Sequence, residues 1–346
     1  MSQISDNNQE KSSNEFIEPI LDAKNQRFSA YPLDPAYNKV WDLYKKQLSQ
    51  MWTAEEVDFS GDYNDFQSLS TNEQFLIKRI LAFFATSDGI VNWNLGERFI
   101  KDIQINEILF GYRYQMMMED IHSEVYSLML ENIVRDLDER VELFNAIETV
   151  PSIKKMANWA FKWIESDKSF AYRVVAFALV EGVFFSGAFA AIFWLKKYKN
   201  NNSSSSKQFM NGLVQSNKFI ARDEGMHCKF ACAVYEKLVN KLSYEDLKEI
   251  VVDAVQIAQE FMTDALPTRL IGINDILMRD YIEYNGDYIA TMLGYNKIFH
   301  KKCPFNFMKT IGLPDKKNFF EIRPDEYQDA HVFNKNKSIL IDIDNF

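Results

Sequence analysis

The chain contains 346 residues, of which 47% are hydrophobic and 14% aromatic, so it can bury one large core or two of ordinary size. Its formal net charge is −10, with 49 acidic against 39 basic residues, and such a surface repels nucleic-acid phosphates. We therefore expect no nucleic-acid partner. Three cysteines without a C-x-x-C pair predict neither a disulfide framework nor a thiolate zinc site, and they favour a reducing, cytoplasmic compartment. The polar residues 1–15 lack the apolar core of a secretory signal.

Only 12 Gly and 8 Pro residues interrupt the chain, which favours helices over strands. Residues 1–30, rich in Asn, Ser, Gln and Glu, are expected to form a flexible arm. A capping box, Ser70 with Glu73 three residues later, predicts the start of a long helix that continues to about residue 99. Further helices are predicted at 36–51, 103–132, 151–166, 170–197, 208–239, 244–265 and 274–293. We expect one helical domain over residues 31–320, followed by a mobile tail at 321–346.

The segment from Val174 to Leu195 is apolar or small at every position except Glu181, and it is long enough to span a bilayer. It is therefore either a membrane span or the central helix of a large soluble bundle. A lone carboxylate near the middle of a membrane span is costly. The core helix is the better interpretation, and its buried acid then needs a partner, for which a cation is the obvious candidate.

Two of the four histidines occur in the pattern Glu-x-x-His, as Glu119 with His122 and as Glu224 with His227. Residues at i and i+3 share one face of a helix, so each pair can present a carboxylate and an imidazole to one point. A single pair of this kind is weak evidence, because buried ion pairing within one helix explains it equally well. Two pairs among four histidines, both in apolar surroundings, favour metal ligation.

Two other long helices each carry one acid in an apolar stretch, Asp88 and Glu181. In chain order the four helices supply Asp, Glu-x-x-His, Glu and Glu-x-x-His, which is the plan of ferritin-like di-metal carboxylate proteins. We therefore predict an all-α, ferritin-like helical bundle with a di-metal carboxylate site in its four-helix core. Four carboxylates and two imidazoles suit Fe(II) or Mn(II) and leave positions open for O₂, whereas structural zinc sites favour thiolates.

Tyr126 follows His122 by four residues and Glu119 by seven, so it lies on the ligand face of the same predicted helix. Position alone allows either a core tyrosine bonded through its hydroxyl or a redox-active tyrosine. Phe185 and Phe189 are expected to face the same interior. Such an apolar lining would exclude water and reductants from a radical.

Five segments of the chain carry a specific family pattern: 51–58 (MWTAEEVD), 83–91 (FFATSDGIV), 121–128 (IHSEVYSL), 180–187 (VEGVFFSG) and 221–228 (ARDEGMHC). Through them the sequence resembles the small, radical-generating subunit of class I ribonucleotide reductase, of the eukaryotic and viral type. The resemblance covers about residues 18–328. It implies a subunit that generates a radical used by a second protein to reduce ribonucleotides to deoxyribonucleotides for DNA synthesis.

The resemblance also implies roles for individual residues. Two iron ions per chain, with manganese as the less expected alternative, would be bound by Asp88, Glu119, His122, Glu181, Glu224 and His227. Tyr126 matches the residue that the family oxidises to a stable tyrosyl radical when the reduced centre reacts with O₂. Trp52 matches the tryptophan that delivers an electron during cofactor assembly and takes part in radical transfer. Asp223 matches the carboxylate that connects this tryptophan to His122, as a carboxylate bonded to a ligand imidazole should.

Partners follow from the same resemblance. A large subunit would bind ribonucleoside diphosphates and perform the reduction, and the small subunit would form a homodimer. Tyr327 matches the tyrosine that relays the radical between the subunits. Residues 339–346 resemble the tail that docks on the large subunit, although Asn345 departs from the family's pattern. O₂ and an electron donor would be needed for assembly.

Two other classes of protein share part of this pattern. A ferritin-like oxidase, such as a fatty-acyl desaturase or a hydrocarbon monooxygenase component, would explain the ligands but not the combination of Tyr126, Trp52 and the tail. A structural partner subunit or an iron-storage protein would require neither the radical tyrosine nor the complete ligand set.

Overall fold

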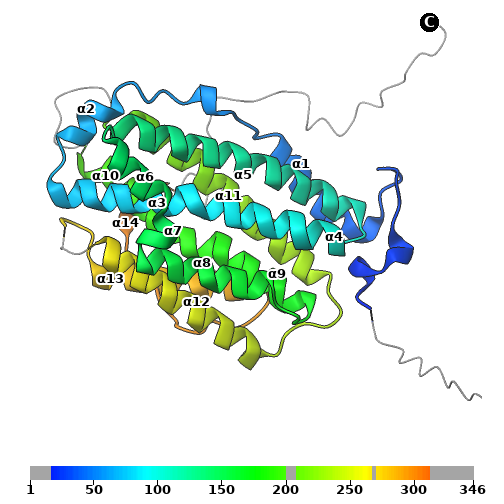
Figure 1. Ribbon diagram of the computed structural model, residues 1–346. Coiled ribbons are helices and arrows are strands. Elements are labelled where there is room, and N and C mark those ends of the chain that lie inside the picture. Colours follow the sequence, from blue (N-terminus) through cyan, green and yellow to red (C-terminus); the bar gives the residue numbers. More distant parts are fainter. Residues whose placement is uncertain (1–16, 200–207, 267–269, 312–346) are drawn as a thin grey trace, which may run out of the picture.

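The computed structural model describes residues 17–199, 208–266 and 270–311 (Figure 1). Within these ranges the regular structure is helical, apart from an isolated bridge between Leu270 and Ile273. The all-α prediction is confirmed. Tyr327 and the predicted tail at 321–346 lie outside the described residues, as do residues 1–16 of the predicted arm.

Nine helices of ten residues or more form most of the part of the bundle that the structure describes. They are α1 (Asn38–Leu48), α3 (Thr71–Asn94), α5 (Asn106–Ile133), α8 (Pro151–Ile164), α9 (Phe170–Leu179), α10 (Phe185–Lys199), α11 (Asn211–Glu236), α12 (Tyr244–Ala265) and α13 (Asp275–Met292). Figure 1 shows α3 and α5 side by side, with α8, α12 and α13 on the lower side of the bundle. The predicted helices are therefore present, with ends that differ by a few residues.

Local sequence explains where several of these helices begin. At the start of α3 the backbone N–H of Ser70 donates to the Glu73 carboxylate at 2.9 Å, which confirms the predicted capping box. Pro151 occupies the first turn of α8, where its missing N–H costs nothing. The start of α11 depends instead on another helix, because Asp62 accepts hydrogen bonds from the N–H groups of Gly212 and Leu213. Burial raises the pKa of Asp62 to about 6.

Several short elements were not predicted. They are the helices α2 (Asp62–Gln67), α4 (Ile100–Asp102), α6 (Leu137–Phe144), α7 (Ala146–Thr149) and α14 (Asn306–Ile311), the π-helical turns η5 (Leu95–Phe99) and η6 (Val180–Phe184), and the 3₁₀ turns η1 (Pro19–Leu21), η2 (Ala23–Asn25), η3 (Pro35–Tyr37) and η4 (Ala54–Glu56). The two π turns continue α3 and α9 and change the direction in which the following residues face. Elements of one or two turns are formed by tertiary packing, and they lack the long apolar repeat by which helices are recognised.

Residues 17–30, which belong to the predicted flexible arm, pack on the bundle. Ile20 has no exposed surface, and its carbonyl oxygen accepts from the N–H of Gln104 at 2.8 Å. The amide of Asn106 donates to the carbonyl oxygens of Arg27 and Ser29. The arm prediction therefore differs from the structure for these residues, because the buried Ile20 side chain and the hydrogen bonds to Gln104 and Asn106 hold the segment on the bundle.

The apolar segment forms the continuous rod of α9, η6 and α10. It is long and apolar enough to cross a membrane, but 94% of its most apolar window is buried inside the bundle. Its small residues permit close helix packing: a Cβ at Gly187 would lie 2.7 Å from Met262, and one at Gly182 would lie 2.5 Å from Ile289. The interpretation as the central helix of a soluble bundle fits this placement.

Candidate metal centre

Four elements bring the predicted ligands together in the interior. Asp88 lies on α3, Glu119 and His122 on α5, Glu181 in the π turn η6, and the second Glu-x-x-His pair on α11. None of the six side chains is more than 1% exposed: Asp88, Glu119, His122, Glu181, Glu224 and His227. Buried carboxylates in this number are stable only if cations or protons compensate their charge.

The ligand atoms fall into two groups that share one residue. Glu119, Glu181, Glu224 and His227 form the first group, and Asp88, Glu119 and His122 form the second; within each group the ligand atoms lie within 4.8 Å of one another. The two oxygens of Glu119 face different imidazoles: Oε1 lies 3.0 Å from Nδ1 of His227 and Oε2 lies 3.3 Å from Nδ1 of His122. Glu119 could therefore contribute one ligand atom to each of the two groups.

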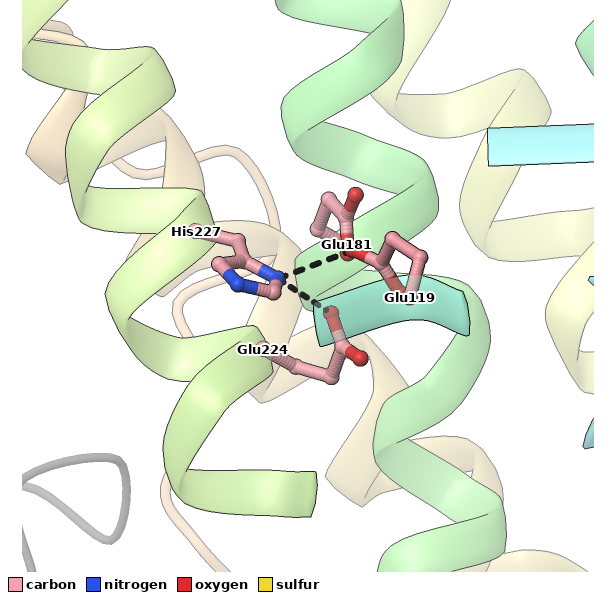
Figure 2. A group of neighbouring side chains, drawn as sticks. All are labelled: Glu119, Glu181, Glu224 and His227. Atoms are coloured by element: carbon pink, nitrogen blue, oxygen red, sulfur yellow. Dashed lines mark hydrogen bonds and ion pairs between the residues drawn. The ribbon is translucent and has the colours of Figure 1, made fainter. Parts of the chain in front are cut away.

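Figure 2 shows the His227 imidazole facing the carboxylates of Glu119 and Glu224, with Glu181 beside Glu119. Glu224 also faces the other imidazole, because its Oε1 lies 3.1 Å from Nδ1 of His122. Glu224, like Glu119, therefore faces both imidazoles.

Several of these buried ligand atoms have no hydrogen-bond partner. They are both carboxylate oxygens of Asp88, Oε2 of Glu119, Nδ1 of His122, Oε2 of Glu181 and Oε1 of Glu224. Some lie within ion-pair distance of each other without hydrogen-bond geometry, because they point toward common positions rather than at one another. Unpartnered oxygen and imidazole donors converging in this way fit two divalent cations.

The electrostatics of the site favour the binding of cations. Burial, followed by repulsion from Glu119, raises the pKa of Asp88 well above its usual value. Burial and the charge of Glu224 do the same for the pKa of Glu181. Burial alone would lower the pKa of His227, but the charges of Glu119 and Glu224 outweigh it and raise that pKa to about 9. Without metals the site therefore holds protons that cations would displace.

Gln115 is a site residue that the sequence did not reveal. It is fully buried on α5, and its Nε2 donates to Oε1 of Glu119 at 3.1 Å and to Oε1 of Glu181 at 2.9 Å. It therefore orients the carboxylate of Glu119, which belongs to both ligand groups, and that of Glu181, which belongs to the first group. Its position four residues before Glu119 was the available signal, but a glutamine on the ligand face is not distinctive in a single sequence.

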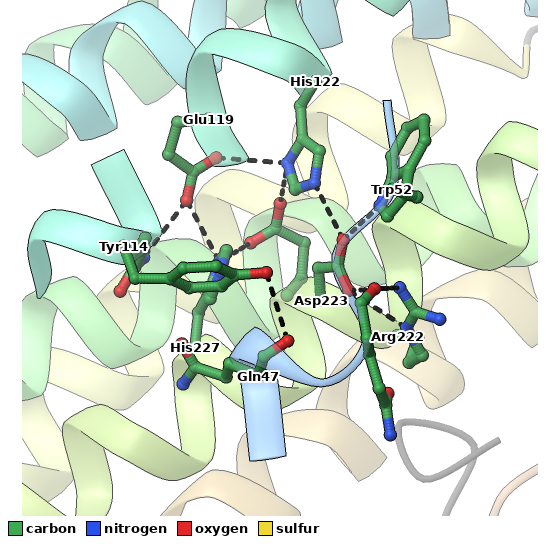
Figure 3. A network of polar contacts seen from close by, with 11 residues as sticks. Gln47, Trp52, Tyr114, Glu119, His122, Arg222, Asp223 and His227 are labelled. Carbon is green, nitrogen blue, oxygen red and sulfur yellow. Dashed lines mark hydrogen bonds and ion pairs between the residues drawn. The ribbon is translucent and has the colours of Figure 1, made fainter. Parts of the chain in front are cut away.

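A polar chain connects the metal centre to Trp52 (Figure 3). The Trp52 indole Nε1–H donates to Oδ2 of Asp223 at 2.6 Å, and the same oxygen lies 3.2 Å from Nε2 of His122. The rings of Trp52 and His122 are nearly parallel, with centroids 5.9 Å apart. The structure thus brings the three residues together as expected.

Arg222 completes this chain, and the sequence did not single it out. Its Nε and a terminal nitrogen donate to Oδ1 of Asp223 at 3.0 and 2.9 Å. Burial would raise the pKa of Asp223, but the Arg222 charge and the hydrogen bonds from His122 and Trp52 lower it below its usual value. Asp223 is therefore held as a carboxylate in the interior.

Tyr126 lies in an aromatic enclosure next to the centre. It is 1% exposed, and its hydroxyl has no hydrogen-bond partner. Phe84 stacks on its ring at 4.5 Å, and Phe189 and Phe185 stack on Phe84 at 5.1 and 5.8 Å. Burial, and then the charge of Asp88, raises the pKa of Tyr126 well above its usual value. The phenol is protonated and shielded from solvent.

Known proteins resemble this chain over most of its length. Residues 29–304 match the family model described as ribonucleotide reductase, small chain. The chain is 48% identical to the human ribonucleoside-diphosphate reductase subunit M2, and the match covers 94% of this chain and 82% of the relative. It is 47% identical to a vaccinia virus ribonucleoside-diphosphate reductase small chain, and the match covers 95% of this chain and 100% of the relative. Among solved structures it is similar to a ribonucleotide reductase homodimer from Saccharomyces cerevisiae, with a TM-score of 0.75, 34% identity and coverage of 84% of this chain and 90% of that one.

Proposed function

The chain belongs to the small-chain family of ribonucleotide reductase, and on this basis we propose that it generates and stores a tyrosyl radical for a large subunit. One observation carries the proposal: two groups of buried metal ligands share Glu119, and Tyr126 is enclosed beside them on the same helix. A ferritin-like oxidase acting on a bulky substrate needs room beside its ligands, whereas aromatic rings fill the space around Tyr126.

Two iron ions are the proposed cofactor, bound by Asp88, Glu119, His122, Glu181, Glu224 and His227. When bound, iron would supply the redox chemistry that reduces O₂ and leaves an oxidising equivalent for Tyr126. The chain's own residues would hold the metals in place, since Gln115 orients two of the carboxylates and Asp223 holds the ring of His122 from its far side.

Tyr126 would give one electron to the oxidised centre, and its phenolic proton would pass to the neighbouring Asp88 carboxylate, whose charge acts on the phenol. Its hydroxyl has no competing hydrogen bond, and the rings of Phe84, Phe185 and Phe189 keep water and reductants away from the radical. Trp52 is the proposed route for electrons between this centre and the outside, because its indole N–H and the His122 ring share Oδ2 of Asp223.

Partners are proposed from the family. A large subunit would receive the radical through Tyr327 and the tail at 321–346, and it would reduce ribonucleoside diphosphates to deoxyribonucleotides. We also propose a homodimer, a metal-binding domain that ends near residue 320, a cytoplasmic location, and a need for O₂ and an external electron donor during assembly.

Electron paramagnetic resonance after addition of Fe(II) and O₂ tests the proposal. We expect a tyrosyl signal in the wild type and its loss in Tyr126→Phe. Tyr112→Phe is a matched control, because Tyr112 lies on the same helix, is fully buried and also has an unpartnered hydroxyl. An iron-loaded, folded wild type without a signal, or a signal that persists in Tyr126→Phe, would show the proposal to be wrong.

A further inference from the structure

A second buried tryptophan, like Trp52, donates its indole N–H to a carboxylate. Trp159, on α8, is 4% exposed, and its Nε1–H donates to Oδ2 of Asp253 on α12 at 2.7 Å. Its ring contacts that of Phe184 at 5.1 Å. Phe184 ends the π turn η6 and lies one helical turn after Glu181, so Trp159 is one aromatic ring away from the turn that carries a metal ligand.

An unbroken series of aromatic rings leads from Trp159 to the surface. Trp163 follows four residues later on α8, with ring centroids 6.0 Å apart, and Tyr172 on α9 stacks on Trp163 at 6.0 Å with an interplanar angle of 14°. Trp163 and Tyr172 are half-buried. Burial, and then the neighbouring Asp246 carboxylate, raises the pKa of the Tyr172 hydroxyl. The series therefore runs from a buried ring to rings that reach solvent.

We propose that Trp159, Trp163 and Tyr172 form a one-electron path that discharges oxidising equivalents which the metal centre fails to place on Tyr126. The inference rests on the proposed function, since the oxidant is the centre after its reaction with O₂. Without such a path, an equivalent that does not reach Tyr126 would oxidise the surrounding side chains. Electron transfer is fast between aromatic rings in contact, and Trp and Tyr are the side chains that sustain it.

One electron moves inward along the path in three steps, and one proton leaves Tyr172. Trp159 gives one electron to the centre, Trp163 gives one to Trp159, and Tyr172 gives one to Trp163, so both tryptophans return to their original state. The phenolic proton of Tyr172 moves to the Asp246 carboxylate. A thiol or another one-electron reductant in solution then reduces the tyrosyl radical, and the proton returns to the phenolate oxygen.

Local charges make Trp163 a transient carrier of the oxidising equivalent rather than a place where it is held. The Trp163 indole nitrogen is buried without a partner, so an oxidised Trp163 has no base to which it can lose its proton. The Lys162 ammonium lies 5.2 Å from its ring centroid and disfavours a lasting positive charge there. At the two ends, Asp253 accepts a hydrogen bond from Trp159 and Asp246 lies near Tyr172. Both negative charges favour oxidation of these rings.

Mass spectrometry of the protein after the reaction tests the path. In Tyr126→Phe, loaded with Fe(II) and exposed to O₂ without reductant, we expect oxidised Tyr172. Adding Trp163→Phe should abolish that product and move oxidation inward to Trp159, whereas Trp163→Tyr should restore it. Trp93→Phe is the control, because Trp93 is 59% exposed on α3 and lies outside the series. Oxidation of Tyr172 that Trp163→Phe leaves unchanged would overturn the path.

A photochemical measurement without metal separates the path from the proposed function. A ruthenium photo-oxidant is attached at Lys168→Cys, next to Tyr172, in a Cys303→Ser chain. Flash oxidation should produce a transient tryptophan radical in this chain, and Trp159→Phe with Trp163→Phe should remove it. Equal transients in both chains would refute the path even if the metal centre behaves as proposed. If the double variant loses the tryptophan transient but the iron-loaded wild type shows no tyrosyl signal, only the proposed function is refuted.

Discussion

Asp223→Asn is the change whose effect on stability the structure defines most sharply. Asparagine keeps the shape of aspartate but replaces one oxygen by an NH₂ group. In the wild type, one carboxylate oxygen faces the donors of Trp52 and His122, and the other faces two donors of Arg222. Whichever way the amide is turned, its NH₂ group therefore meets N–H donors on one side.

The cost follows from the bonds that this clash removes. Two hydrogen bonds to a charged group are worth about 1.5–3 kcal/mol each. Arg222 is only 5% exposed, and removing the partner of a buried charge costs about 3–5 kcal/mol. The carbonyl oxygen of Gln50 still accepts from Arg222 at 2.8 Å, so we expect the lower end, about 3 kcal/mol in the free energy of unfolding.

Urea denaturation of the metal-free protein, followed by circular dichroism, measures this loss. Asp120→Asn is the matched control, because Asp120 is exposed and accepts one hydrogen bond from the amide of Asn92 at 2.7 Å. We expect it to change the free energy of unfolding by less than about 0.5 kcal/mol. If Asp223→Asn costs less than about 1 kcal/mol, Asp223 does not compensate the buried charge of Arg222.

Two further expectations concern packing and protons. Gly111→Ala should destabilise the fold by about 1–3 kcal/mol, since its Cβ would lie 2.1 Å from the Phe230 ring on α11. Gly89→Ala should be neutral or stabilising by up to about 1 kcal/mol, because no atom lies within 4 Å of the added Cβ. Thermal denaturation compares the two variants, and equal melting temperatures would contradict the close approach of α5 to α11. Metal binding should strengthen as pH rises, because Asp88 and Glu181 have raised pKa values and each proton that they hold must leave when a cation binds. Anaerobic calorimetric titration with Mn(II) in buffers of different ionisation enthalpy counts these protons, and an affinity that stays constant from about pH 6 to about pH 8 would contradict the raised pKa values.

The sequence by itself determined the fold class and the identity of the candidate ligands. Spacing along a helix fixes which side chains share a face, so Glu119 with His122 and Glu224 with His227 could be paired from their spacing alone. The capping box at Ser70 was also readable, because a cap is a contact between neighbours in sequence. The two interpretations of Tyr126 remained open, because a core tyrosine and a redox-active tyrosine would occupy the same face of the helix.

Only the tertiary structure decided how the ligands are shared and supported. That Glu119 belongs to both metal groups depends on the distances between helices, which no spacing along one helix contains. Gln115 and Arg222 acquire their roles through packing between helices, which brings Glu181 to Gln115 and the Gln50 carbonyl oxygen to Arg222. The π turn that holds Glu181 likewise has no local pattern. Periodicity sets which face of a helix is buried, and packing sets what that face meets.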